Sequence, residues 1–253
     1  MQLHYQIQGQ GEPLLILHGL FGSLDNWGSQ AKALAQQFQV ISVDLRNHGR
    51  SPHSDEMSYA AMAQDLIELL DSLNSARARI LGHSMGGKVA MQLALNVPER
   101  IERLIVVDIA PVQYPHHHDD VFKGLFAVEL HSLKSRADAE KQLAPFIEDP
   151  MVRAFLLRNL YRTDAGGFAW RINLEGLHRG YAGIAAAPQG TPFEGPTLFI
   201  KGGNSDYIRP HHRDALLALF PNAGYKVIDG AGHWPQAEKP ALTTRLIENF
   251  LLG

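Results

Sequence analysis

The stretch Ala78-Arg79-Ile80-Leu81-Gly82-His83-Ser84-Met85-Gly86 runs from an apolar segment into a serine with glycines close on both sides. Its first residues predict a strand that stops at Gly82, and residues 85–96 have the spacing of a helix. A chain that passes from strand to helix within one residue needs small neighbours, which Gly82 and Gly86 supply. The pattern predicts that Ser84 projects from a sharp turn at the end of a strand.

Apolar runs alternate with helical patterns on both sides of this turn. Such continuous apolar strands are typical of a parallel sheet that helices cover on both faces. We therefore predict the α/β class, with a mostly parallel, doubly wound sheet. Further strands are expected at residues 14–17, 38–43, 104–109, 197–201 and 225–228, and further helices at residues 62–73, 214–219 and 240–251.

The alternation is interrupted after Pro111. Residues 112–192 are polar and helical in pattern, and no strand is expected there. The predicted organisation is an α/β core of residues 1–111 and 193–253, with a small helical insertion at 112–192. An insertion that follows a strand at its carboxyl end lies over the sheet edge where ligands bind, so we expect it to act as a cap.

Composition excludes several classes of function. The net charge of −3 gives no electrostatic basis for binding nucleic acid or an anionic membrane. The absence of cysteine excludes disulfides, thiolate catalysis and cysteine-ligated metals. The amino-terminal residues do not resemble a signal peptide, and no apolar run has membrane-spanning length. We expect a cytoplasmic protein with a small-molecule substrate and with neither a nucleic-acid nor a membrane partner.

Ser84 has the residue types around it that an attacking serine needs. The helix after it presents backbone N–H groups and the positive end of its dipole to a developing oxyanion. In such turns one oxyanion N–H comes from the residue after the serine, here Met85, and the other from an early loop. The early loop is His18-Gly19-Leu20-Phe21-Gly22. We predict the N–H of Leu20 as the second donor, with Phe21 as the next choice.

The candidate base is His233, in Gly230-Ala231-Gly232-His233-Trp234, between the last strand and the last helix. The order serine, acid, histidine along the chain is that of hydrolases with this turn. Two acids fit. Asp206 follows the strand before the histidine strand, but its Gly-Gly-Asn-Ser-Asp context is also ordinary turn composition. Asp108 ends an apolar run, where a buried carboxylate needs a partner such as an orienting histidine. The expected burial of the carboxylate favours Asp108, and Asp206 stays open.

Two other polar segments are not assigned to catalysis. The loop 44–51 is interpreted as structural, braced by Asp44 and Arg46. The consecutive His116, His117 and His118 cannot easily converge on one ion, so a solvated segment at the start of the insertion is favoured over a metal site. Nothing in the sequence requires a metal or an organic cofactor.

Taken together, these motifs resemble the α/β-hydrolase superfamily over nearly the whole chain, and more narrowly the YbfF-type esterases and the abhydrolase-domain 11 proteins. The resemblance implies carboxylesterase activity on short acyl esters, with acyl-CoA thioesters as a second substrate class, and a small helical cap. It places the acid in the Val-Asp-Ile-Ala-Pro stretch, hence at Asp108, with Asp206 as a possible stand-in. The matching stretches are 18–27, 44–49, 82–88, 107–111, 202–205 and 230–234.

Two alternative functions stay open, because function depends on the site and not on the fold. Hydrolases or lyases that cleave carbon–carbon bonds keep a serine at this turn. A non-catalytic ligand-binding protein of the same fold could also retain it. Relatives that use an aspartate as nucleophile are disfavoured by Ser84 itself.

Overall fold

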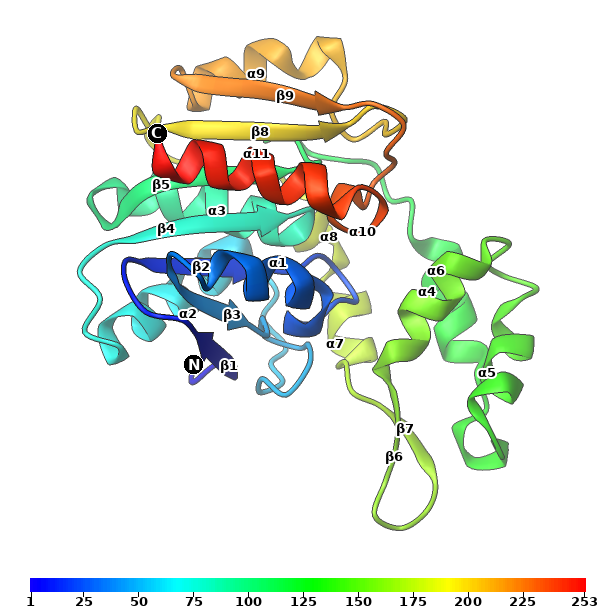
Figure 1. The fold of residues 1–253 in the computed structure, drawn as a ribbon. Helices are drawn as coiled ribbons and strands as arrows, with labels where there is room; N and C mark the ends of the chain where they lie inside the picture. Colours follow the sequence, from blue (N-terminus) through cyan, green and yellow to red (C-terminus); the bar gives the residue numbers. More distant parts are fainter.

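The computed structural model describes all residues, 1–253, and contains a seven-stranded sheet in the order β1-β3-β2-β4-β5-β8-β9 (Figure 1). Only β1 is antiparallel to its neighbour, so the predicted fold class is confirmed. The strands are β1 (Tyr5–Gln8), β2 (Pro13–Leu17), β3 (Gln39–Val43), β4 (Ala78–His83), β5 (Ile101–Val107), β8 (Thr197–Gly202) and β9 (Ala223–Ile228).

Helices cover both faces of the sheet (Figure 1). On one face Trp27 and Ile247 are fully buried in one apolar cluster with the sheet, and on the other Leu66, Met91 and Phe220 belong to a larger cluster. Burying such a side chain stabilises the fold by about 2 kcal/mol. The first face carries α1 (Gly28–Leu34) and α11 (Pro240–Leu252), and the second carries α2 (Tyr59–Ser72), α3 (Met85–Asn96) and α9 (Arg213–Leu219).

Two strand predictions need correction. The strand predicted at residues 104–109 ends at Val107 and not at residue 109, because Asp108 has a φ of +53° and leaves the extended conformation. The edge strand β1 was not expected, because Tyr5-Gln6-Ile7-Gln8 is too polar to form an apolar run. Antiparallel pairing with β3 nonetheless adds it to the sheet.

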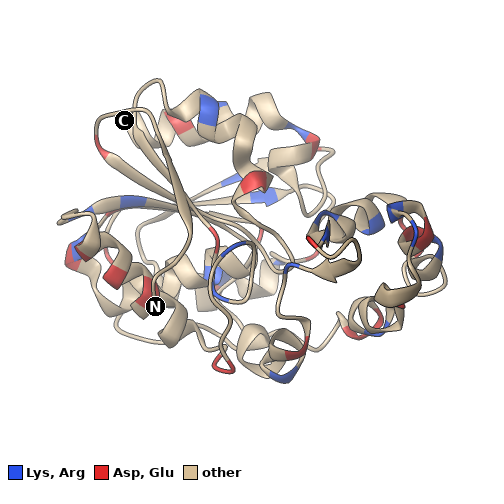
Figure 2. Ribbon diagram, turned by 90° about the horizontal axis from the view of Figure 1, so that it is seen from below, with Lys and Arg blue, Asp and Glu red and all other residues tan.

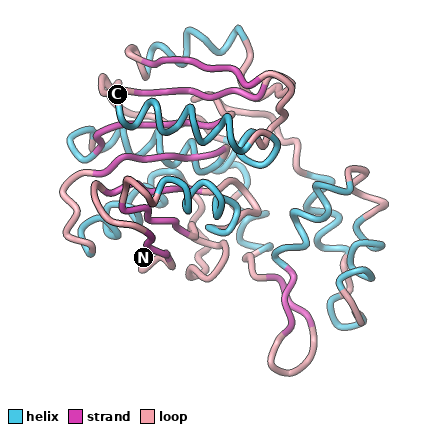
Figure 3. Tube along the Cα trace, viewed as in Figure 1, coloured by secondary structure: helices cyan, strands magenta, loops and turns pink.

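The segment between β5 and β8 lies beyond the carboxyl ends of the parallel strands and contains five helices (Figures 1 and 3). It also contains a β-hairpin, contrary to the expectation that it holds no strand. The hairpin escaped prediction because each strand has only three residues, too few to display a period. Its elements are α4 (Asp119–Ala127), α5 (Arg136–Leu143), α6 (Pro150–Leu156), β6 (Leu160–Arg162), β7 (Phe168–Trp170), α7 (Leu174–Arg179) and α8 (Tyr181–Ala185).

Charged residues of both signs are interspersed over the ribbon seen from below in Figure 2. Neither sign dominates that view, as expected for a net charge of −3. None of the helices combines the length and the apolar character needed to cross a bilayer.

Candidate active site

Ser84 forms the turn between β4 and α3, with φ 51° and ψ −121°. The flanking glycines are required by close packing. A Cβ on Gly82 would lie 2.2 Å from the carbonyl oxygen of Gly86, and one on Gly86 would lie 2.4 Å from that of His18. The Ser84 N–H donates to Val107 on the neighbouring strand at 3.0 Å. The left-handed turn is thus built into the packing of β2, β4 and α3, and it presents the serine at the sheet edge.

Three of the predicted side chains come together at this edge. His233 Nε2 lies 3.1 Å from Ser84 Oγ, and His233 Nδ1 lies 2.7 Å from Asp108 Oδ2. With the proton of a neutral imidazole on Nδ1, the ring donates to the carboxylate and accepts from the serine hydroxyl. This is the geometry of an activated nucleophile, with its base and an orienting acid.

The carboxylate of Asp108 is fully buried and held by several donors. Besides His233, the Gly202 N–H donates to Oδ1 at 2.9 Å, and the Ser205 hydroxyl donates to Oδ2. These hydrogen bonds offset the desolvation of the buried charge and fix its orientation. Asp108 is therefore oriented toward the histidine by the end of β8 and the loop that follows it.

The structure does not bring Asp206 to His233. Its side chain is 85% exposed and forms an ion pair with Arg209 at 3.2 Å. The preceding residue, Ser205, occupies the buried position beside Asp108, so that Asp206 faces solvent. Strand order alone does not distinguish the two candidate acids, but only Asp108 is buried and in contact with His233.

Two aromatic side chains that the sequence analysis did not single out hold His233 in place. The ring of Tyr207 stacks on the imidazole, with centroids 3.9 Å apart. The Nε2 of His83 lies 2.7 Å from the His233 carbonyl oxygen. Burial lowers the pKa of His83 to about 3, so the ring is neutral and donates this hydrogen bond. His83 could have been found from its position inside the Ser84 turn, but nothing in the sequence pairs Tyr207 with the histidine.

The backbone N–H groups of the two predicted oxyanion donors, Leu20 and Met85, differ in their hydrogen bonding from that of the alternative, Phe21. The Phe21 N–H donates to His48 Nε2 at 3.1 Å, whereas the Leu20 N–H has no acceptor within the protein. Met85 is the first residue of α3, where helical N–H groups lack an intrahelical partner. Burial lowers the pKa of His48 to about 3, which keeps its ring neutral and able to accept. The N–H groups of Leu20 and Met85 thus have no acceptor in the protein.

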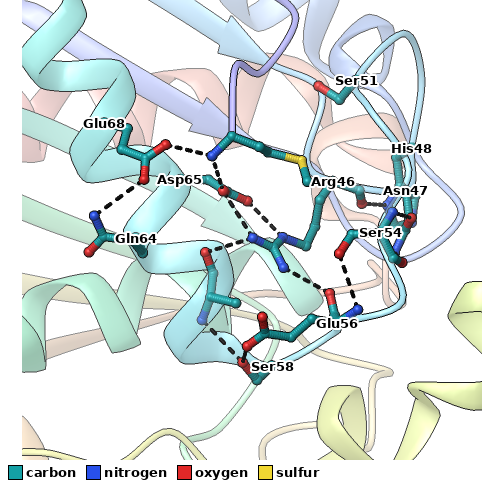
Figure 4. Close-up of polar contacts among 12 residues, drawn as sticks. Arg46, Asn47, His48, Ser51, Ser54, Glu56, Ser58, Gln64, Asp65 and Glu68 are labelled. Atoms are coloured by element: carbon teal, nitrogen blue, oxygen red, sulfur yellow. Dashed lines mark hydrogen bonds and ion pairs between the residues drawn. The ribbon is translucent and has the colours of Figure 1, made fainter.

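The loop beneath this site is braced by an ion pair (Figure 4). Arg46 donates to both carboxylate oxygens of Asp65, at 2.7 and 2.9 Å, and to the Glu56 carbonyl at 2.8 Å. Asp44 accepts from the Leu24 N–H at 2.8 Å. These contacts fit the structural role predicted for Asp44 and Arg46, since neither reaches Ser84.

Two cavities reach Ser84. The larger has a volume of ≈ 700 Å³, and the smaller one of ≈ 30 Å³. Two of the three histidines that begin the insertion form hydrogen bonds near these cavities: His117 Nε2 lies 2.7 Å from the Tyr207 hydroxyl, and His118 Nδ1 lies 2.5 Å from the Tyr181 hydroxyl. The larger cavity is lined from the core by Trp27, Trp234 and Gln236, and from the insertion by His118, Val152 and Phe155.

The comparisons with known proteins identify the family of the chain. A family model described as the alpha/beta hydrolase fold matches residues 12–240. Esterase YbfF of Escherichia coli (strain K12) is 41% identical over 97% of this chain and 95% of its own length. The sn-1-specific diacylglycerol lipase ABHD11 of Mus musculus is 44% identical over 94% of this chain and 80% of its own. A solved structure described as a marine microorganism esterase matches with a TM-score of 0.96 at 40% identity, covering 98% of this chain and 99% of that one. The chain therefore belongs to the α/β-hydrolase family, among its carboxylic ester hydrolases.

Proposed function

We propose that the chain is a serine carboxylesterase that hydrolyses short-chain acyl esters through an acyl-enzyme on Ser84. The observation that carries the proposal is the continuous set of hydrogen-bond distances from Ser84 through His233 to Asp108. The similarity to proteins named as esterases supports it independently. We assign residues 112–192 to a cap, because these residues contribute His118, Val152 and Phe155 to the cavity over Ser84.

In the first step Ser84 Oγ attacks the ester carbonyl carbon, and its proton passes to His233 Nε2. The carbonyl oxygen becomes an oxyanion, which the N–H groups of Leu20 and Met85 stabilise. The bond from carbon to the alcohol oxygen then breaks, and His233 gives its proton to that oxygen. Asp108 stays ionised throughout and stabilises the imidazolium.

In the second step water attacks the acyl-enzyme and gives a proton to His233 Nε2. The bond between Ser84 Oγ and the acyl carbon breaks, and the same proton returns to the serine, which leaves the carboxylic acid as product. The same two steps would cleave acyl-CoA thioesters, with a thiol as leaving group. The choice of Leu20 rests on the free N–H that Phe21 lacks, and the choice of Asp108 over Asp206 rests on the contact with His233.

The test is turnover of p-nitrophenyl acetate by the wild type and by Ser84→Ala. We expect the wild type to hydrolyse the ester and the variant to lose at least about 10³-fold in kcat, because an alanine has no oxygen to acylate. Ser132→Ala, a change at an exposed serine, is the matched control and should keep full activity. Equal turnover by Ser84→Ala and the wild type would contradict the proposal.

A further inference from the structure

The two cavities approach Ser84 from different sides. Both are lined by Ser84, Leu20 and Tyr207. The residues that differ are informative: His233 lines only the larger cavity, and Met85 lines only the smaller one. The proton donor of the proposed reaction thus lies on one side of the serine, and an oxyanion donor lies on the other.

This asymmetry determines which part of an ester enters which cavity. His233 must give its proton to the departing alcohol oxygen, so the alcohol has to leave on the side of His233. The acyl chain, on the other side of the carbonyl carbon, then points away from the histidine. Resting on the proposed esterase function, we propose that the ≈ 30 Å³ cavity holds the acyl chain and the ≈ 700 Å³ cavity holds the alcohol. The enzyme therefore selects short acyl groups and accepts bulky alcohols.

The small cavity limits the acyl group by its size and by its walls. A cavity needs about 10–15 Å³ of this kind of volume to hold one water, so ≈ 30 Å³ suits an acyl tail of one or two carbons. Its walls include Tyr59, Tyr181 and Ile184, all buried. The Tyr59 hydroxyl donates to the Ile184 carbonyl at 2.5 Å, which ties α2 to α8. A longer chain would have to displace packed side chains, which is costly.

The large cavity, unlike the small one, extends toward solvent and has aromatic walls. Its lining includes Met151 on α6, which is 65% exposed, so the cavity continues toward solvent at the insertion. Phe155 and Trp234, whose rings lie 5.7 Å apart between centroids, offer aromatic surface on its walls. Such a cavity accepts alcohol groups of many sizes.

Lys88 keeps the small cavity closed and is the positioning residue of this arrangement. It lies one helical turn after Ser84, and its buried Nζ donates to the carbonyls of Ala185 and Ala186 at 3.1 and 2.6 Å. These carbonyls lie at the end of α8, so the lysine binds the insertion to α3 directly behind the nucleophile. The Tyr114 ring also contacts Lys88 Nζ, which lies 4.7 Å from the ring centroid, and no carboxylate forms a salt bridge with it.

The experiment compares two substrate series with the wild-type protein. In the first, the alcohol is p-nitrophenol and the acyl group grows from acetyl to octanoyl. In the second, the acyl group is acetyl and the alcohol is a primary alkanol that grows from methanol to octanol, so that its size increases while its acidity stays nearly constant. In the first series we expect kcat/KM to fall about tenfold for each methylene beyond the acyl length that fits the small cavity. In the second series it should not fall as the alcohol grows.

Variants then locate the two effects. Ile184→Ala should raise the ratio of hexanoyl to acetyl turnover at least about tenfold and leave the ranking of alcohols unchanged. Met151→Ala, on the other cavity, should alter the ranking of alcohols and not that of acyl groups. Lys88→Met should broaden the acyl profile as Ile184→Ala does, a change in specificity that a mere loss of stability would not produce.

The outcomes separate this proposal from the proposed function. Turnover that is indifferent to acyl length but limited by alcohol size would overturn the assignment of the cavities and leave the esterase function intact. That result needs no variant, so a misfolded mutant cannot obscure it. A wild type that cleaves no ester in either series would overturn both proposals.

Discussion

The phenol ring of Tyr207 lies on the imidazole of His233, with ring centroids 3.9 Å apart and planes inclined by 20°. The hydroxyl of the same tyrosine lies 2.7 Å from His117 Nε2, at the start of the insertion. One side chain thus contacts both the proposed base and the insertion. The stacking restricts the imidazole to the plane in which its two nitrogens face Ser84 and Asp108.

This contact predicts different outcomes for two substitutions of Tyr207. Tyr207→Phe keeps the stacked ring and loses only the hydroxyl, so kcat for p-nitrophenyl acetate should stay within about twofold of the wild type. Tyr207→Ala removes the ring, and a stacking energy of about 1 kcal/mol predicts a loss of roughly fivefold. If the phenylalanine variant is as slow as the alanine variant, the hydroxyl and not the stacking holds the base.

The two carboxylates give a matched pair of substitutions. Asp108→Asn removes the charge that stabilises the imidazolium, and an amide cannot both accept from His233 Nδ1 and keep the donors around it, so kcat should fall about 10⁴-fold. Asp206→Asn changes an exposed side chain and should leave kcat within about twofold. Steady-state kinetics at pH 8 measure both. A slow Asp206→Asn and an active Asp108→Asn would reverse the assignment of the acid.

Buried histidines predict an acid-labile fold. Burial lowers the pKa of His18 to about 4 and those of His48 and His83 to about 3, below the ordinary value of 6.5. As the pH falls below 6.5, the unfolded chain takes up protons at these rings and the folded chain does not, so the free energy of unfolding decreases until the pH nears 3–4. At pH 5 each of these rings lowers the free energy of unfolding by up to about 2 kcal/mol.

Urea unfolding at pH 7.5 and pH 5.0 measures this dependence. We expect a clearly lower midpoint at pH 5.0, and a smaller difference between the two pH values in His18→Asn than in the wild type. His131→Asn, at an exposed position, should keep the full difference. A midpoint that does not change with pH in the wild type would mean that these rings are already protonated or accessible in the folded protein.

The sharp turn at Ser84 can be predicted from the sequence because the requirements of such a turn are local. Gly82 and Gly86 are needed wherever a strand turns into a helix this sharply, and the early loop and the His233 loop lie at predictable strand ends. The choice between the two candidate acids, in contrast, does not depend on local sequence. Asp108 and Asp206 both follow strands, and only tertiary packing, which buries one and exposes the other, separates them.

Other features depend on contacts that no local pattern records. Tyr207 lies 26 residues before His233 in the chain and meets it only across two loops. The hairpin of β6 and β7 and the edge strand β1 are too short or too polar to give a strand pattern, and pairing stabilises them instead. The walls of the two cavities come from the core and the insertion together, so the sizes of the cavities depend on tertiary packing that no sequence pattern records.

Whether Ser84 is the nucleophile is tested by mapping the residue that a fluorophosphonate modifies covalently, using peptide mass spectrometry. We expect one equivalent of label on the peptide that contains Ser84, much slower labelling in His233→Gln, and none in Ser84→Ala. Label on another residue at the same rate, or an unlabelled wild type that still hydrolyses esters, would contradict the assignment of Ser84 as the nucleophile.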